Sequence, residues 1–380
     1  MKGILLWLDR VAVMTLKELK QLSRDPILLV VIGYFFTADI YIAGAGISID
    51  LKNAPIAVID RDHSAASREL IYRFQPPYFN FQQELESNRQ AVRLLDEGRV
   101  LAVIDIPEHF QRDLLAGRQV AVQMQVDASN ATLGTLATTY AARIVARFGM
   151  ELAERGMGPV QLQALPVVED RQRVYYNPNQ ADTWFMSISE LITVITMLSL
   201  MLPAAAAVRE KERGTIEQLA VSPLSPTQIL LPKVLAMGLA VMGGVAAALF
   251  LIIEPVFHVP IKGSIPLFFL ATALYVFASS GLGLFIATLS RNLGQVVMLV
   301  LLIMMPMLLL SGAWTPPEAM PTLLCEAMHL SPLFYLTEMS YAILLKGAGM
   351  EILWKQMLQL ALLGCVVFAF GVWRFRRQFG

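Results

Sequence analysis

The sequence has few charged residues and few cysteines for its length. Charged side chains make up 16% of its 380 residues, and thirty basic residues balance thirty acidic ones. This balance gives no support to nucleic-acid binding through a strongly basic surface. The two cysteines, Cys325 and Cys365, lie in different apolar segments. They therefore offer neither a disulfide framework nor a cysteine metal cluster.

The sequence also lacks a phosphate-binding loop. It contains no G-x-x-x-x-G-K-[ST] match, and glycine is nowhere followed directly by lysine. No group of residues with a catalytic or metal-binding spacing stands out either, and His63 and His109 are each isolated surface candidates. We therefore expect a chain without its own ATPase site, catalytic residues, cofactor or metal.

What the sequence has in abundance is long apolar runs. Hydrophobic residues make up 56% of the chain, and the mean hydropathy is +0.56. These values predict a mainly α-helical integral membrane protein. A membrane-spanning helix needs about 20 mostly apolar residues. This length predicts six transmembrane helices, at Pro26 to Ile47, Trp184 to Ala207, Ile229 to Ile253, Ile265 to Leu289, Leu293 to Gly312 and Leu353 to Trp373.

Residues 1–25 have an amphipathic pattern instead. Leu5, Leu8 and Leu16 recur at helical spacing, while Lys17 and Lys20 fall on another face. This pattern is typical of a helix that lies in the membrane interface. The alternative is that the segment simply leads into the first span.

Residues 48–180 have an ordinary soluble composition and form a predicted second domain between the first and second spans. The runs PIAVID, VLAVIDIP and VAVQMQVD predict strands. Between and after them, SAASRELIYRF, SNRQAVRLLDEG, PEHFQRDLLAG and residues 133–155 predict helices. We expect a mixed α/β extracytoplasmic domain.

Basic residues collect beside the spans in a way that predicts orientation, because cytoplasmic loops are enriched in lysine and arginine. With six spans all four groups fall on one side, which places both termini in the cytoplasm and domain 48–180 outside. The groups are Lys17, Lys20 and Arg24; Arg209, Lys211 and Arg213; Arg291; and Arg374, Arg376 and Arg377.

Residues 311–350 do not form a further simple span. Four prolines interrupt the segment and leave two apolar helical pieces, each shorter than a spanning helix. We expect re-entrant or interfacial helices on the outer side.

The segment 208–228 follows the second span and has an unusual order of residues. A dense charge cluster, REKER, gives way to Gly214 and Thr215, then to a short predicted helix at Ile216 to Val221, then to two Ser-Pro pairs. A short rigid helix between two spans is suited to transmitting a push from a soluble motor. A solvated connecting loop with positive-inside residues is the alternative.

The string REKERGTIEQLAVSPLSPTQILLPK resembles the coupling segment of the permease subunits of ABC-2-type exporters. The similarity continues through LKELKQLSRDP, APIAVIDRD, IPEHFQRDLLAGRQ, VPIKGSIPLF, SGAWTPPEAMP, LLKGAG and RFRRQFG. It is strongest to bacterial inner-membrane drug-export permeases, which have an outer domain of this length.

The resemblance implies a dimer of six-span subunits, each bound to a cytosolic ABC ATPase that holds the ATP and Mg²⁺. It also implies a periplasmic membrane-fusion adaptor, and it leaves open whether the second permease is identical or related. The residues that it assigns to the ATPase-coupling interface are Glu18, Arg24, Arg209, Glu210, Arg213, Gly214, Thr215, Glu217 and Ser222.

Two acidic residues lie inside predicted spans, where an ionised carboxylate is costly without a partner or a cavity. Asp39 is in the first span, and Glu190 is on a polar stripe of the second span that includes Ser187 and Thr193. These four residues are candidates for a substrate path that binds a cationic group. An internal hydrogen bond, or pairing with the outer domain, is the alternative. Met298 and Met304 in the fifth span are further candidates, with ordinary packing against lipid or a second subunit as their alternative.

These features favour the permease of an ATP-driven exporter of amphiphilic small molecules. An ion-coupled secondary transporter that uses Asp39 and Glu190 is one rival, although no internal repeat is visible. A membrane receptor or scaffold that does not transport is the other.

Overall fold

The structure is a computed structural model that describes residues 2–46, 51–127, 131–156, 181–214, 225–313 and 320–379. By contacts between residues the chain divides into two units. One unit consists of Met1–Ile47 together with Arg173–Gly380, and the other is Ser48–Gln172. We describe each unit by itself.

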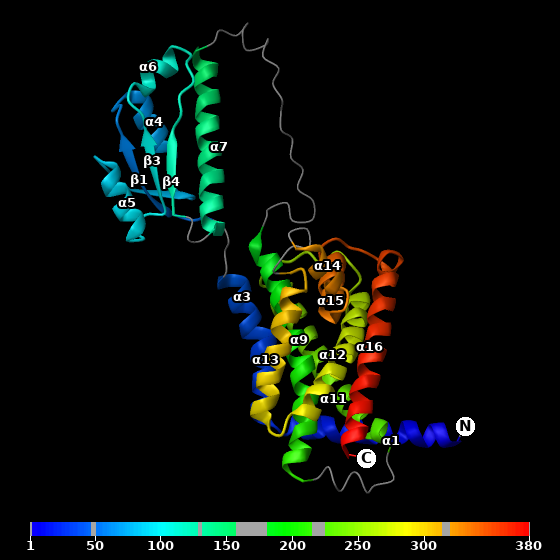
Figure 1. Cartoon of the computed structure of the whole chain (residues 1–380). Helices are drawn as coiled ribbons and strands as arrows, with labels where there is room; N and C mark the ends of the chain where they lie inside the picture. The colour runs from blue at the N-terminus through cyan, green and yellow to red at the C-terminus, as the bar shows by residue number, and fades with distance from the viewer. Residues whose placement is uncertain are drawn as a thin grey trace. The chain divides into compact units, whose positions relative to one another are not determined.

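The first unit is a bundle of helices (Figure 1). Five helical stretches in the described part of the chain are long and apolar enough to cross a membrane. They are Pro26–Gly46 (helices α2, Pro26–Tyr34, η1, Phe35–Asp39, and α3, Ile40–Gly46), Asp182–Glu212 (α9), Thr227–Ile253 (within α11, Pro226–Ala247, and η2, Ala248–Ile253), Ile265–Leu289 (α12) and Met350–Arg377 (within α16, Met350–Phe379).

The predicted fifth span is shorter than expected. Helix α13 runs over Leu293–Leu309, which is 17 residues, and ends before the predicted boundary at Gly312. At 1.5 Å per residue this helix is about 25 Å long, slightly less than the roughly 30 Å of hydrocarbon in a bilayer. The count of six spans therefore stays a prediction.

Further helices lie at the two ends of the bundle. Helix α1, Lys2–Ser23, lies across the end where α16 finishes, and the chain termini are both at that end (Figure 1). Its residues Leu5, Leu8 and Leu16 are exposed, while Val11 and Leu22 are buried against the bundle. At the opposite end lie α14, Thr322–Met328, and α15, Pro332–Leu344, the two short pieces predicted between residues 311 and 350.

Glycines allow α12 to pack closely against its neighbours. A Cβ at Gly283 would lie 2.5 Å from the carbonyl oxygen of Leu200 in α9, and one at Gly281 would lie 2.8 Å from the backbone of Phe368 in α16. The buried hydroxyl groups of Tyr275 and Thr196 are hydrogen-bonded at 2.9 Å across the same α9–α12 contact. Since small residues let helix backbones approach, α9, α12 and α16 form the tightly packed centre of the bundle.

Two spans contain a π-helical turn at facing positions. The π-helix η1 ends at Asp39, and η2 covers Ala248–Ile253. Phe36 of η1 is buried against Gly244 of α11, where a Cβ would lie 2.0 Å from its ring. π-Turns widen the backbone and often occur at functional sites. Asp39, the last residue of η1, is therefore a candidate for such a site.

The second unit is a four-stranded sheet covered by helices on both faces (Figure 1). The strand order is β2-β1-β3-β4, with β1 parallel to β2 and β3, and β4 antiparallel to β3. The strands are β1, Ala54–Asp60; β2, Phe79–Glu84; β3, Ala102–Ile106; and β4, Gln123–Val126. The helices are α4, Ala65–Arg73; α5, Asn88–Asp96; α6, Phe110–Leu115; and α7, Ala131–Gly156.

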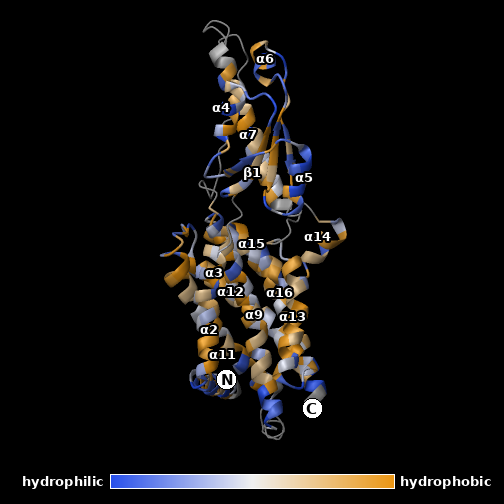
Figure 2. Ribbon diagram, turned by 90° about the vertical axis from the view of Figure 1, so that its left-hand side faces the viewer, coloured by the Kyte–Doolittle hydropathy of each residue, from blue (hydrophilic) through white to orange (hydrophobic). Residues whose placement is uncertain are grey.

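Alternation along β1 explains the two faces of this sheet. Ile56 and Val58 pack with α4, α6 and α7, whereas Ala57 and Ile59 pack with α5. Figure 2 shows that hydrophobic residues predominate along the bundle helices, whereas this unit mixes hydrophilic and hydrophobic residues. The prediction of a mainly helical membrane protein with a small mixed sheet is therefore confirmed, although strand β2 was not predicted.

Candidate functional site

Helix α9 runs to Glu212, so it includes the first residues of the predicted coupling segment 208–228, and the part of that segment beyond the helix begins near Gly214. Arg213 caps the helix, and Gly214 follows with a φ of 67°, a left-handed conformation that glycine adopts readily. This glycine thus stops α9 and turns the chain. The predicted interface residues Thr215, Glu217 and Ser222, and the predicted helix at 216–221, lie outside the described residues.

A buried ion cluster joins three helices just before that stop. The Nζ atom of Lys233 in α11 lies 3.0 Å from Oε1 of Glu18 in α1 and 2.6 Å from Oε1 of Glu210 in α9. Lys233 and Glu18 are 2% and 3% exposed. Lys17 adds a more distant contact, with its Nζ 3.8 Å from Oε1 of Glu210. We call Lys233, Glu18 and Glu210 the lysine-centred cluster.

This cluster contains two of the residues predicted at the ATPase-coupling interface. The carboxylates of Glu18 and Glu210 both point inward to Lys233, and Glu18 is almost completely buried. Their part in an ATPase interface stays a prediction. A buried ammonium needs charged partners, which explains why the glutamates turn inward. Sequence reasoning missed Lys233, although a lone lysine within the apolar segment 229–253 was a visible signal.

A second ion pair, which is partly exposed, joins the same elements. Arg209 of α9 donates to Oδ2 of Asp25 at 2.8 Å, and Asp25 also accepts a hydrogen bond from the backbone N–H of Leu28, so it caps α2. The Leu28 N–H and the Arg209 guanidinium hold the pKa of Asp25 below its usual value. The α1–α2 turn is therefore fixed to the end of α9.

Basic residues, among them Arg209 of this ion pair, line a pocket at this end of the bundle. It has a volume of about 610 Å³ and lies between α1 and the end of α9. Three predicted interface residues, Arg24, Arg209 and Arg213, line it. Its other lining residues are Lys17, Lys20, Gln21, Asp25 and Pro26. Five cationic side chains against one carboxylate make this pocket suited to an acidic partner.

The last turn of α9 also contacts α12 and α13. Lys211 donates to the carbonyl oxygens of Ala287 and Ser290 at the end of α12. Glu212 accepts a hydrogen bond at 3.1 Å from the backbone N–H of Leu293 at the start of α13. The end of α9 thus contacts four other helices within a few residues of Gly214.

The structure brings Asp39 and Glu190 together. The carboxyl group of Glu190 in α9 lies close enough to that of Asp39, at the end of η1, for the two groups to interact electrostatically. No lysine, arginine or histidine of the described ranges forms an ion pair with either carboxyl group. We call these two residues the carboxyl pair. Two neighbouring carboxylates favour a shared proton or a bound cation.

The other substrate-path candidates do not form one surface. Ser187 is buried and donates to the carbonyl oxygen of Trp184, and Thr193 donates to that of Ser189, so both hydroxyls bond within α9. Met304 is 7% exposed in the core, whereas Met298 is 72% exposed on another face of α13. Met298 and Met304 therefore lie on different faces of α13, and their place in a substrate path stays a prediction.

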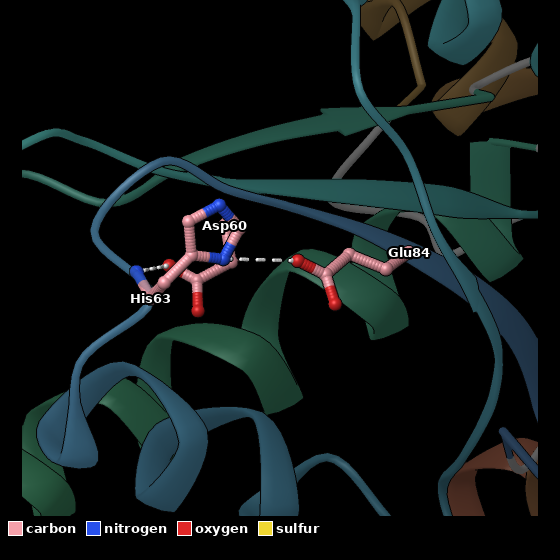
Figure 3. Close-up of side chains that lie close together, drawn as sticks. All are labelled: Asp60, His63 and Glu84. Carbon is pink, nitrogen blue, oxygen red and sulfur yellow. Dashed lines mark hydrogen bonds and ion pairs between the residues drawn. The ribbon is translucent and has the colours of Figure 1, made fainter.

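A further group of polar residues lies in the sheet unit, at the end of β1. Asp60, His63 and Glu84 each have a side-chain oxygen or nitrogen atom that could bind a metal ion, and these atoms lie within 4.8 Å of one another (Figure 3). His63, which the sequence suggested was isolated, pairs with Glu84 at 3.4 Å. The Asp60 carboxylate already accepts hydrogen bonds from the N–H groups of Asp62 and His63 and from the hydroxyl of Ser67. These bonds give Asp60 a structural role in the turn.

Fold and site together define a class, a polytopic helical membrane protein with a basic pocket at one end of its bundle. The family described as ABC-2 family transporter protein matches residues 26–373, so the chain belongs to this family. Family membership confirms the prediction of a membrane permease of an ABC exporter, a transport subunit rather than an enzyme.

Named relatives match almost the whole chain. It is 36% identical over 365 residues to the inner membrane transport permease YhhJ of Escherichia coli K12, covering 96% of each protein. It is 29% identical to YbhR of the same organism, a probable multidrug ABC transporter permease, covering 95% of this chain and 97% of that one. YbhS, which has the same description, is 25% identical over 90% of each chain.

Proposed function

We propose that this permease exports amphiphilic small molecules, powered by a separate ABC ATPase that docks at the α1–α9 end of the bundle. The observation that carries the proposal is the basic pocket of Arg24, Arg209 and Arg213, placed beside Gly214, where the coupling segment begins. An acidic surface of the ATPase is the matching partner. The multidrug descriptions of YbhR and YbhS support the substrate class.

Reversal of charge in the pocket tests the docking site. The double variant Arg24→Glu/Arg213→Glu is expected to insert normally but to lose about 90% of the co-purified ATPase, because like charges that face each other across an interface cost several kcal/mol. Arg376→Glu is the matched control, since Arg376 is an exposed arginine of α16 outside the pocket. Equal recovery of ATPase with the double variant and the wild type would contradict this docking site.

The carboxyl pair is the proposed contact for a cationic group of the substrate. Asp39 and Glu190 face each other without a described basic partner, beside the π-turn η1. Asp39→Asn and Glu190→Gln, singly and together, are expected to reduce efflux of a cationic amphiphile about tenfold and to leave a neutral analogue of equal size unaffected. Glu254→Gln, at an exposed glutamate after η2, is the control. An unchanged substrate range would contradict the assignment.

The same pair supports one rival function. Two carboxyl groups in contact could carry a proton, as in an ion-coupled transporter. Efflux that persists after a protonophore collapses the proton gradient, and that stops without ATP, favours the exporter. The opposite result favours ion coupling. Substrate-stimulated ATPase activity in vesicles separates either transporter from a receptor or scaffold.

We further propose that both termini are cytoplasmic, that the domain 48–180 is periplasmic, and that the permease works as a dimer with an identical or related copy. A periplasmic membrane-fusion adaptor would contact the outer domain. The position of α1 and the arginine-rich end of α16 at one end of the bundle supports this orientation. In a cysteine-free background, a membrane-impermeant thiol reagent is expected to label Arg89→Cys but not Arg376→Cys in spheroplasts.

A further inference from the structure

Lys233 is a charged residue in an otherwise apolar span, and its ammonium group is shared by two other helices. It contacts Glu18 of α1 at 3.0 Å and Glu210 of α9 at 2.6 Å, and its side chain is 2% exposed. Burial of these charges carries a desolvation cost that an apolar residue at this position would avoid. The contact is therefore not explained by the need to pack α11.

The two glutamates belong to the two elements on which a docked ATPase would act. Glu210 is in the last turn of α9, shortly before the left-handed Gly214 from which the coupling segment leaves. Glu18 is in α1, next to Lys17, which lines the basic pocket. One ammonium group thus connects both sides of the proposed docking site to α11.

The lysine-centred cluster is more deeply buried than the ion pair of Arg209 and Asp25. The side chains of Arg209 and Asp25 are 27% and 28% exposed, so water and salt weaken their attraction. Lys233 and Glu18 are shielded from both. α11 also continues into the π-turn η2 at its other end, and that turn contacts η1, which ends at Asp39. A displacement of α11 would therefore reach the carboxyl pair.

We propose that Lys233 is a positioning residue that makes α1, the end of α9 and α11 move as one body. When the coupling segment moves, α11 moves with it and displaces the substrate path. Without Lys233, α1 and α9 would move relative to each other instead. This inference rests on the proposed function, in which an ATPase acts at this end of the bundle.

The test is the number of substrate molecules transported per ATP hydrolysed, measured in proteoliposomes that contain the permease and its co-purified ATPase. For Lys233→Met we expect ATP hydrolysis to continue while this ratio falls about tenfold, within the usual range of coupling between sites. Lys233→Arg, which keeps the charge, is expected to stay within about twofold of the wild type. Lys355→Met, at an exposed lysine of α16, is the matched control.

The triple variant Glu18→Gln/Glu210→Gln/Lys233→Met protects the test against misfolding. It leaves no unpaired buried charge, so it is expected to fold, and the proposal predicts that it too is uncoupled. A wild-type transport ratio in the folded triple variant, or in Lys233→Met, would overturn the positioning role. A wild-type permease that recovers no ATPase would instead overturn the proposed function, and the positioning role with it.

Discussion

The two groups of charged residues inside the bundle differ in their balance of charge. In the lysine-centred cluster, Lys233 lies between Glu18 and Glu210, and nearby Lys17 brings the formal charge of the group to zero. In the carboxyl pair, Asp39 faces Glu190, and no cation of the described residues pairs with them. A balanced group is satisfied within the protein, whereas a pair of like charges needs a proton or a cation from outside. The first therefore fits a mechanical role and the second a binding role.

Removal of one charge from each group is the strongest way to break this comparison. Lys233→Met removes the central cation from buried Glu18 and half-buried Glu210 and leaves only the more exposed Lys17 near them. Loss of one partner from a buried pair costs about 3–5 kcal/mol. Asp39→Asn relieves a contact between like charges and is expected to leave stability unchanged or slightly raised. The midpoints of unfolding of both variants in one detergent provide the measurement. Equal destabilisation by both variants would remove the distinction.

A smaller effect is expected from a change in the close packing of α9 against α12. Gly283→Ala would place a methyl group 2.5 Å from the carbonyl oxygen of Leu200, and overpacking of this kind costs about 1–3 kcal/mol. Gly33→Ala is the matched control, because nothing lies within 4 Å of a Cβ there. We expect Gly283→Ala alone to lower the unfolding midpoint. If both variants unfold at the wild-type midpoint, the close α9–α12 contact does not contribute to the stability of the bundle.

The architecture was largely predictable because length and periodicity determine it. The predicted span Ile265 to Leu289 coincides with α12, strands β3 and β4 fall within the predicted runs, and β1 begins one residue before its run. Strand β2 was missed because its sequence, FNFQQE, is mostly polar, and five of its six residues are exposed. Its pairing with β1 comes from tertiary context and not from an apolar pattern.

The candidate site was predictable in part. The charged residues of segment 208–228 indicated the carboxyl-terminal end of α9. The sequence alone did not show which of their side chains point into the bundle. Glu210 and Arg209 are adjacent in the chain, yet one binds buried Lys233 and the other binds Asp25. Their partners are distant in sequence, so only the fold reveals the pairing. The contact between Asp39 and Glu190 was equally hidden, because it joins two different spans.

The smallest expected effect concerns the partly exposed link at Asp25. Asp25→Asn keeps the cap of α2 but loses the charge that pairs with Arg209, a change of less than about 1 kcal/mol at neutral pH. Because the folded protein lowers the pKa of Asp25, this contribution is fully present above the ordinary value of 3.8 and is lost as the pH falls through the lowered pKa. Unfolding midpoints of variant and wild type should therefore converge in acid. A difference that grows in acid would contradict this account.

The most direct measurement of the central claim is efflux of a cationic amphiphile from proteoliposomes that contain the permease and its co-purified ATPase. The account predicts that efflux requires ATP, continues after a protonophore collapses the proton gradient, and falls about tenfold in Asp39→Asn/Glu190→Gln. Efflux that follows the proton gradient and ignores ATP would contradict it.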